Sequence, residues 1–408
     1  MRFAADLHLH SRYASGVSPA MTLENIALWA QRKGVDLLGT GDCLQPQWLA
    51  EIAESTVEAE PGLLALKPEI EAGVHARLPR KLHRPLRFVL STEVNCVAAG
   101  KTEMTGIHQL IYFPSLTVAR EFAERLSRKG DLMEGRPTLS ISPKDLVRGA
   151  ANFERVYVAA PHVMNPWFSV LGVVGGGVSA AEVYGDEARN LLAIETGLTS
   201  NPEMCRRVPS LDRFGLYSCS DAHSLDNIGR ECTLLDIEPS YDALMAALRA
   251  GARDRIKGTL KFPIELTRYF LNWCSNCKEP FDERHNCPQC RRKLTKGSRD
   301  RMAELDGVRA QADFPEKSPP FEALRPLSHV IADVEGKKPG TVGVRRAVGE
   351  IVDQLGHERY ILTEAEPTDL LRRASPELAD RILNQRTGEV SRKTDQARAP
   401  LGQGGFGF

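Results

Sequence analysis

The sequence predicts an α/β fold in which seven strands form a barrel, followed by two smaller units. Up to about residue 260, short apolar runs alternate with amphipathic segments, which is typical of parallel strands joined by helices. The chain has 408 residues, too many for one ordinary core, so two or three domains are expected. Beyond residue 261 the alternation stops, and a cysteine-rich stretch and a polar stretch follow.

The strands are predicted from buried apolar runs and the helices from apolar residues three and four positions apart. The seven strand candidates are residues 3–9, 35–39, 88–94, 107–113, 156–160, 191–195 and 216–220. The helix candidates are residues 23–33, 118–129 and 241–250. Thr22 suits the N-cap of the first helix, and Gly34 and Gly251 suit the position just past a helix end. Strand and helix in repetition predict parallel pairing, and seven strands favour a barrel over an open sheet.

The rest of the chain is predicted to be mostly helical. A helix is expected at residues 299–308, a linker at 313–320, and a helical region at 321–386 that includes segments 342–355 and 376–385. Residues 387–408 are polar and then glycine-rich, which predicts a flexible tail.

Composition limits the cellular setting. No apolar run is long enough for a membrane-spanning helix, and the N-terminus does not resemble a signal peptide. Four of the nine cysteines form two CxxC pairs, which indicates metal binding in a reducing compartment, so we expect a cytoplasmic protein. The 53 basic and 53 acidic residues balance, which argues against a wholly basic nucleic-acid binder but allows a local basic patch.

Histidine, aspartate and glutamate residues recur at the ends of the predicted strands. In a parallel barrel the carboxyl ends of the strands converge on one face, where catalytic residues are found. One such histidine alone is more often a hydrogen-bonded core residue than a ligand, but a set of this size predicts a polynuclear metal site. The candidate metal ligands are His8, His10, Asp42, Glu93, His108, His162, Asp221 and His223, and Glu195 is a further candidate at a strand end.

These residue types indicate the metal and its chemistry. Imidazole with carboxylate suits zinc, manganese or iron, whereas calcium would need oxygen ligands alone. We expect two or three catalytic divalent ions (zinc, manganese or magnesium) that hold a phosphate and lower the pKa of a bound water. Glu93, Asp221 and Glu195 are the candidate catalytic carboxylates; Glu93 and Asp221 could bridge ions, and Glu195 could orient a water or a ligand imidazole.

The motifs DLHLHS, GTGD, STEV, GIHQL, APH and SDAH resemble those of the PHP (polymerase and histidinol phosphatase) family. The resemblance implies a distorted seven-stranded barrel and phosphoester hydrolysis. It implies one metal on His8, His10, Glu93 and Asp221, a second on Glu93, His108 and His162, and a third on His223 with help from Asp42. Two departures put the third metal in doubt: Cys43 stands where the family usually has a histidine, and residues 11–18 lack a further histidine.

The two CxxC pairs predict a structural zinc site. The spacing Cys-x2-Cys-x9-Cys-x2-Cys suits a tetrahedral thiolate shell that stabilises a small module with little core, on Cys274, Cys277, Cys287 and Cys290. A basic run follows at once and could neutralise phosphates of nucleic acid, although such a run is often only a solvated surface. The candidate DNA-binding residues are Arg291, Arg292, Lys293, Lys296 and Arg299.

A barrel of this kind followed by a zinc site and a helical region resembles the endonuclease Q family. The phrases LWAQRKGVDLLGTGD, AIETG and HVIADVEG carry the resemblance, together with the cysteine pairs. It implies a PHP barrel at residues 1–262, a four-cysteine zinc module with the basic run at 263–300, a helical DNA-binding domain at 301–386 and the tail at 387–408. It also implies metal-dependent nicking of DNA on the 5′ side of deaminated bases (uracil, hypoxanthine, xanthine) or abasic sites.

Two alternatives stay open at this point. A small-molecule phosphatase of the histidinol-phosphate type would keep the barrel but leave the zinc module and the basic run unexplained. A non-catalytic nucleic-acid-binding protein on a decayed barrel would fit Cys43 but not the nearly complete ligand set. The sequence indicates DNA with damaged bases as the partner and no membrane, and it leaves a repair or replication protein partner unknown.

Overall fold

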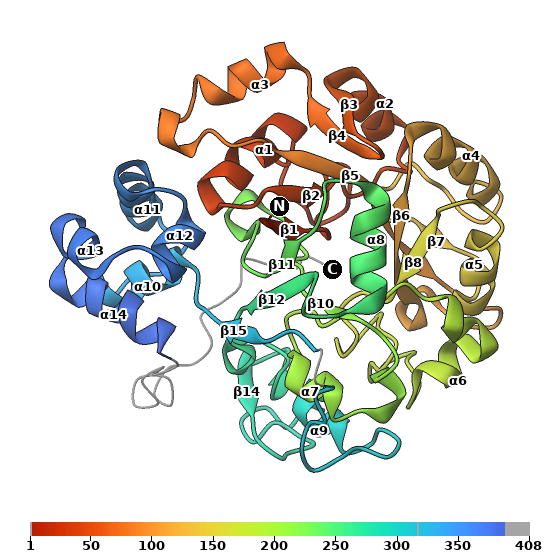
Figure 1. The fold of residues 1–408 in the computed structure, drawn as a ribbon. Coiled ribbons are helices and arrows are strands. Elements are labelled where there is room, and N and C mark those ends of the chain that lie inside the picture. The colour runs from red at the N-terminus through yellow and green to blue at the C-terminus, as the bar shows by residue number, and fades with distance from the viewer. Residues whose placement is uncertain (1, 316–317, 388–408) are drawn as a thin grey trace.

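The computed structural model describes residues 2–315 and 318–387, which form a mixed α/β protein with a large central sheet and surrounding helices (Figure 1). The linker predicted at 313–320 is therefore described only in part, and the predicted tail lies outside the described residues beyond Thr387. Within the described ranges, no helix has the length and apolar character needed to cross a membrane.

Strands occur at all seven predicted positions, most of them shorter than predicted. They are β1 (Arg2–Asp6), β2 (Leu37–Gly39), β5 (Arg87–Cys96), β6 (Ile107–Phe113), β8 (Tyr157–Ala159), β9 (Ile194–Glu195) and β10 (Leu216–Tyr217).

These strands follow one another around a ring. β1 pairs with β2 and β2 with β5 in parallel, and β6 joins β5 to β8. A parallel bridge between Ala160 and Ile194 connects the end of β8 to β9, which pairs in parallel with β10. A parallel bridge between Leu9 and Ala222 then returns to the segment after β1.

The prediction of parallel pairing is wrong for β6, which runs antiparallel to both of its neighbours. Only residues 97–106 connect β5 to β6, and they contain one short turn of 3-10 helix, η2 (Glu103–Thr105), instead of a crossover helix. Such a short connection returns the chain beside the strand it has just left, which gives antiparallel pairing. The start of β6 therefore lies at the same end of the ring as the carboxyl ends of β5 and β8.

Further strands extend the sheet beyond the predicted ones. β3 (Thr56–Glu60) and β4 (Leu63–Leu66) lie beside β5, which also pairs with β7 (Thr138–Leu139). β11 (Cys232–Asp236), β12 (Ile256–Lys261) and β15 (Phe321–Ala323) extend the other edge from β1. β13 (Asn272–Cys274) and β14 (Glu279–Phe281) form a separate antiparallel pair in the cysteine-rich region.

Helices surround the sheet, and the one predicted at residues 118–129 is found at Leu116–Leu126 instead. Two of them, α1 (Leu23–Lys33) and α8 (Tyr241–Ala250), match their predicted ranges. Thr22 accepts the backbone N–H of Asn25, and Gly34 and Gly251 adopt left-handed φ values of 82° and 57°, as expected for these caps. The others are α2 (Pro46–Ser55), α3 (Pro68–His75), α4 (Leu116–Leu126), α5 (Pro143–Ala150), α6 (Ala180–Tyr184), α7 (Pro202–Arg206) and α9 (Ser298–Met302). α9 covers only part of the helix predicted at 299–308.

An apolar cluster fills the inside of the ring and closes one end of it. Each of the seven strands, or the residue beside it, contributes a buried side chain, among them Ala5, Leu37, Val89, Leu110, Ala159, Ala193 and Tyr217. The buried face of α8, with Leu244 and Leu248, packs on this cluster, and Figure 1 shows α8 lying across the ring. Because α8 closes this end, polar side chains can gather only at the other.

The C-terminal helices pack together beside α1 (Figure 1). They are α10 (Leu327–Val334), α11 (Val342–Leu355), α12 (Glu358–Thr363), α13 (Pro367–Arg373) and α14 (Pro376–Arg386). The end of α1 contacts them through a buried ion pair of Lys33 with Glu358 at 2.7 Å. Arg359 also donates to the carbonyl oxygen of Gly34 at 3.0 Å. The helices are thus fastened to the rest of the chain by charged groups.

Acid is expected to weaken this contact because His357 has to stay neutral in it. Its Nδ1 accepts the backbone N–H of Tyr360 at 3.0 Å at the start of α12. Burial, with the charges of Arg84 and Arg359, lowers the pKa of His357 to about 3. The folded protein therefore binds fewer protons here than the unfolded chain, whose histidine titrates near about 6.5. This stabilisation is complete above about pH 6.5 and is lost as the pH falls toward 3.

The variant His357→Asn tests this, because asparagine can still cap the helix but does not titrate. The thermal midpoint of the original protein should fall more steeply between about pH 7 and pH 5 than that of the variant. The difference should amount to about 1–2 kcal/mol of unfolding free energy at the lower pH. Parallel curves would contradict the expected role of His357.

Candidate metal centre

The predicted strand-end residues gather at the end of the ring that α8 leaves open. His8 and His10 follow β1, Asp42 follows β2, and Glu93 lies within β5. His108 is the second residue of β6 and pairs with Asn95, so the antiparallel direction of β6 brings it to the same end. The others come from the ends of β8, β9 and β10: His162, Glu195, Asp221 and His223.

Three adjoining groups of donors have ligand atoms within 4.8 Å of one another. The first is His8, His10 and Glu93, the second is Glu93, His108 and His162, and the third is His10, Asp221 and His223. Glu93 belongs to two groups and so does His10. The arrangement suits two or three ions that share ligands.

Glu93 lies at the centre of these groups. Its Oε1 is 2.8 Å from Nε2 of His162 and 3.0 Å from Nδ1 of His108. It is 3.5 Å from Nε2 of His8, and Oε2 is 3.5 Å from Nε2 of His10. A carboxylate surrounded by imidazoles in this way can bridge two cations.

The donors fit metal ions because several of their buried atoms have no hydrogen-bond partner among the described residues. A buried polar atom without a partner is costly, and a metal ion would satisfy it. The unpartnered atoms include Nε2 of His8, Nε2 of His10, Nδ1 of His162, Oε2 of Glu93 and Oδ1 of Asp221.

Two carboxylates hold the imidazoles from behind. Glu195 accepts Nδ1–H of His8 at 2.8 Å, the arrangement by which an outer carboxylate orients a ligand histidine. Asp42 does the same for His10 at 2.9 Å, and its other oxygen accepts both the backbone N–H and the hydroxyl of Ser11. Asp42 thus lies outside the three donor groups, although the sequence placed it among the ligands.

The backbone at three of these positions is strained. Asp42, His162 and Asp221 have positive φ values of 48°, 31° and 48°, a conformation that non-glycine residues rarely adopt. Each lies a few residues past the end of a strand. Strain of this kind persists where the surroundings impose it, and it gathers at functional sites.

The glycine of GTGD next to Asp42 is required by close packing. A Cβ at Gly41, whose φ is 61°, would lie 2.2 Å from the carbonyl oxygen of Leu9. Leu9 is the residue between His8 and His10. Gly197 has the same role behind His162, because a Cβ there would lie 2.5 Å from the Cα of His162.

Burial and the neighbouring charges raise the pKa of some groups in the cluster and lower that of others. Burial disfavours the charged form of His8, but the carboxylates around it, chiefly Glu195, outweigh this and raise its pKa to about 9. Burial lowers the pKa of His108 and of His223 to about 4. Burial alone would raise the pKa of Glu93, yet the imidazoles around it hold that pKa well below its usual range. Glu93 is therefore a carboxylate at neutral pH, as a metal ligand must be.

Cys43, which stands where a histidine was expected, contributes nothing to the cluster. Its side chain is fully buried in the apolar core, and burial raises the pKa of its thiol well above the ordinary value. The third donor group forms without it, from His10, Asp221 and His223.

The four cysteines of the CxxC pairs form a second cluster with the geometry of a zinc site. Sγ of Cys274 lies 3.5 Å from Sγ of Cys290, and Sγ of Cys277 lies 3.7 Å from Sγ of Cys287. A tetrahedral site with Zn–S bonds of about 2.3 Å has sulfur atoms about 3.8 Å apart. The backbone N–H of Cys277 points to Sγ of Cys274 at 3.3 Å and lowers the pKa of that thiol to about 7, which favours the thiolate.

The basic run after these cysteines divides into two parts. Arg291, Arg292 and Lys293 are exposed, and no ion pair is found for them within the described ranges. Lys296 pairs with Glu304, and Arg299 pairs with Asp282 and Asp300, so their charges are partly neutralised. The first three residues therefore present the free positive charge.

A pocket of about 70 Å³ adjoins the donor cluster. Besides His162 and Asp221, it is lined by Trp167, Phe168, Arg268 and Tyr269, by Leu198 and by small polar residues. The ring of Trp167 lies edge-on to that of Tyr269 at 4.9 Å, and the ring of Phe168 stacks on His108 at 4.6 Å. Aromatic side chains of this kind can stack on a planar ring such as a nucleobase.

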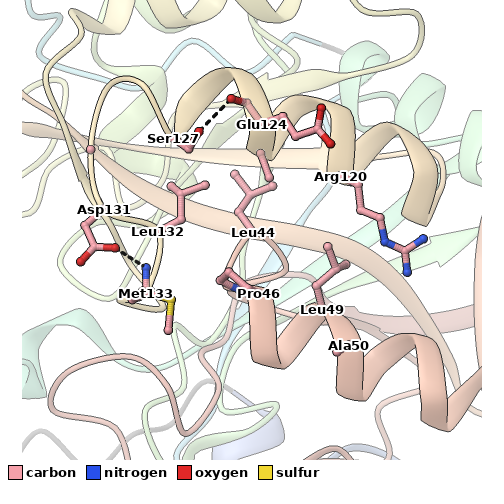
Figure 2. Close-up of a pocket in the computed structure, with 12 residues that line it drawn as sticks. Leu44, Pro46, Leu49, Ala50, Arg120, Glu124, Ser127, Asp131, Leu132 and Met133 are labelled. Atoms are coloured by element: carbon pink, nitrogen blue, oxygen red, sulfur yellow. Dashed lines mark hydrogen bonds between the residues drawn. The ribbon is translucent and has the colours of Figure 1, made fainter.

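A wider hollow of about 620 Å³ lies elsewhere, between α2, α4 and the loop that follows α4 (Figure 2). Leu44, Leu49, Leu132 and Met133 line its apolar part, and none of the predicted site residues lies in it.

One charged residue that sequence reasoning did not single out lies against the metal cluster. Nη1 of Arg136 is 3.6 Å from Oε2 of Glu93, and the side chain is 25% exposed. No motif marks this arginine, which is 43 positions away from Glu93 and in an irregular loop. The other five histidines lie outside the three donor groups; they are His75, His83, His285, His329 and His357.

Comparison with known proteins finds one relative that matches nearly all of the chain and another that matches about half of it. No protein-family model matches the sequence. The uncharacterized protein YqxK of Bacillus subtilis (strain 168) is 27% identical over 404 residues, covering 95% of this chain and 96% of that protein. The uncharacterized protein MJ0043 of Methanocaldococcus jannaschii is 28% identical over 212 residues, 48% of this chain and 26% of that protein.

Two solved structures share the fold over nearly the full length. The lesion-specific endonuclease PfuEndoQ from Pyrococcus furiosus superposes with a TM-score of 0.79 at 26% identity, covering 95% of this chain and 91% of that chain. A complex of endonuclease Q with a 27-mer duplex substrate, with an abasic lesion at the active site, gives a TM-score of 0.82 at 26% identity. It covers 95% of this chain and 92% of that chain.

Proposed function

Since the chain belongs to the endonuclease Q family, as its likeness to both endonuclease Q structures indicates, we propose that it is a metal-dependent endonuclease of DNA repair. We further propose that it nicks the phosphodiester on the 5′ side of a deaminated base (uracil, hypoxanthine or xanthine) or an abasic site. The observation that carries the proposal is the buried donor cluster with unpartnered ligand atoms next to an aromatic pocket.

We propose a division of the chain into three domains. We infer that the ring of seven strands is a PHP-type barrel, and that residues 1–262 form the hydrolytic domain. Residues 263–300 would form the zinc module, with Cys274, Cys277, Cys287 and Cys290 as ligands, and residues 301–386 a helical domain that grips DNA. The exposed Arg291, Arg292 and Lys293 offer the zinc module a contact with phosphates.

In the proposed reaction, His8, His10, Glu93, His108, His162, Asp221 and His223 hold the ions. The ions, when bound, would activate water as the nucleophile and neutralise charge on the phosphate and on the leaving oxygen. Glu195 and Asp42 fix the rings of His8 and His10, so each presents its Nε2 to the cluster. Here Glu195 acts as a positioning residue and does not touch the reacting atoms.

The aromatic pocket supplies the selectivity that the metal centre cannot supply. An enzyme that acts at a damaged base must take the nucleotide out of the stack before reading it. Trp167, Phe168 and Tyr269 offer faces on which an unstacked nucleotide can lie, beside the ligands His162 and Asp221.

Labelled duplexes carrying one uracil, one hypoxanthine, one abasic site or none test the proposal. With magnesium, manganese or zinc, we expect a single metal-dependent nick 5′ to a lesion and none in the undamaged duplex. Hydrolysis of a small phosphomonoester with no nicking would instead indicate a small-molecule phosphatase. Binding of duplex without any hydrolysis, with about one zinc per chain, would indicate a non-catalytic protein.

A further inference from the structure

Arg136 places a fixed positive charge beside the donors of the metal centre. Its guanidinium lies 3.6 Å from the oxygen of Glu93 that has no hydrogen-bond partner. Glu93 belongs to two of the three donor groups, so the guanidinium lies beside both of them.

The backbone on both sides of Arg136 is tied to the segments that carry the metal donors. The N–H of Gly135 donates to the carbonyl oxygen of Tyr13 at 3.0 Å, in the loop just after His10. The N–H of Asn95 donates to the carbonyl oxygen of Pro137 at 2.9 Å, two residues after Glu93. A Cβ at Gly135 would lie 2.7 Å from the backbone nitrogen of Ala14, so the loop packs closely there.

The earlier part of the same loop is anchored against two helices. Leu132 is 7% exposed and belongs to the large apolar cluster between the sheet and the surrounding helices, which also contains Leu44. Figure 2 shows Leu132 and Met133 beside Leu44 at the start of α2 and below α4. The side chain of Gln45 also lies within hydrogen-bonding distance of the carbonyl oxygen of Met133, at 3.4 Å. Arg136 is therefore held by a fixed loop and needs little ordering to act.

The positive charge of Arg136 has no role in holding metal ions. Arginine is always protonated and cannot coordinate a metal ion. Once divalent ions occupy the cluster, their charge and that of Arg136 would exceed the negative charge of Asp42, Glu93, Glu195 and Asp221. Like charges gathered in one site repel, and an anion placed between them relieves the repulsion. The anion that fits is a phosphate group, which guanidinium contacts through two parallel N–H donors.

We propose that Arg136 contacts the phosphate of the substrate, donating its N–H groups to a non-bridging oxygen of the scissile phosphodiester. The inference rests on the proposed function and adds a residue to that site. Arg136 stabilises the charge that develops on the phosphate in the transition state, as a positively charged donor that is already held in place.

Arg136→Ala and Arg136→Lys test the proposal, with the exposed Arg128→Ala in the same loop as the control. We expect Arg136→Ala to lower kcat on a lesion duplex by about 100- to 1000-fold, with the number of bound metal ions unchanged. Arg136→Lys keeps the charge but loses the paired donors, so its kcat should lie between those of the original protein and Arg136→Ala. Added guanidinium should restore part of the activity of Arg136→Ala and leave that of Arg128→Ala unchanged.

Binding of inorganic phosphate to the metal-loaded proteins gives a readout that does not depend on turnover. Calorimetry should show at least about tenfold weaker binding for Arg136→Ala than for Arg128→Ala. If the original protein nicks a lesion duplex and Arg136→Ala nicks it within about threefold as fast, the role of Arg136 is refuted and the proposed function stands. If the original protein nicks no duplex, the proposed function fails, and phosphate affinity alone decides on Arg136. Metal ions lost together with activity in Arg136→Ala and Arg136→Lys would make it a structural residue and overturn the inference.

Discussion

Glu93→Gln is expected to lower the rate of DNA nicking by about 1000-fold or more and to reduce the number of catalytic metal ions bound. Glu93 belongs to two of the three donor groups, and four histidines lie within 3.5 Å of its carboxylate. An amide keeps the shape of the side chain but carries no charge, so it cannot bridge two cations. The four histidines around position 93 would then lack the negative charge that favours metal binding there.

The measurement pairs single-turnover nicking of a lesion duplex with metal analysis of the purified chain. Glu124→Gln is the matched control, because this glutamate is exposed on α4, away from the cluster. Retention of about one zinc per chain in Glu93→Gln would show that the variant folds and that only the catalytic ions are lost. Full nicking activity at unchanged metal content would refute the assignment of Glu93 as a bridging ligand.

Much of the fold of residues 1–262 could be predicted because its local signals and its packing agree. α1 and α8 end where their glycine caps lie, and β6 matches its predicted range. The donors were recognised because a polar residue directly after a buried strand is unusual, and this happened strand after strand. Local signals therefore located the elements and the end of the sheet at which the donors gather.

The direction of β6 could not be predicted from periodicity. An apolar run has the same pattern whichever way it runs, and the prediction of parallel pairing did not consider the short connection at 97–106 that decides its direction. The error did not displace His108, because this residue lies at the start of an antiparallel strand and so at the same end of the ring.

The roles of individual carboxylates and arginines depend on packing between distant segments. Asp42 has the residue type of a ligand, but its oxygens face Ser11 and His10. Arg136 reaches Glu93 only because the loop before β7 packs on the segment after β1. The basic run likewise looked uniform in sequence, yet Lys296 and Arg299 are paired with nearby acids. No local pattern contains such information.

Cys287→Ser is expected to remove one zinc ion per chain and to unfold the cysteine module while the metal centre in the barrel stays intact. The module has almost no core of its own: its buried apolar cluster consists of Cys274, Cys287 and Leu294, with a few partly buried neighbours. Structural zinc supplies about 10–16 kcal/mol in small zinc-binding peptides, so a module with so little buried surface should depend on it.

The loss should appear in three measurements. Zinc per chain should fall by one, limited proteolysis should cut within residues 274–297, and the affinity for a lesion duplex should fall by at least about tenfold as the exposed arginines lose their rigid support. Gln289→Ala, an exposed position between two of the cysteines, is the control and should change none of these. The ions at Glu93 should remain, because no donor of that cluster comes from the module.

Unchanged zinc content and an uncut module in Cys287→Ser would mean that the four thiols do not form a structural zinc site. The DNA contact proposed for Arg291, Arg292 and Lys293 would then lose its physical basis.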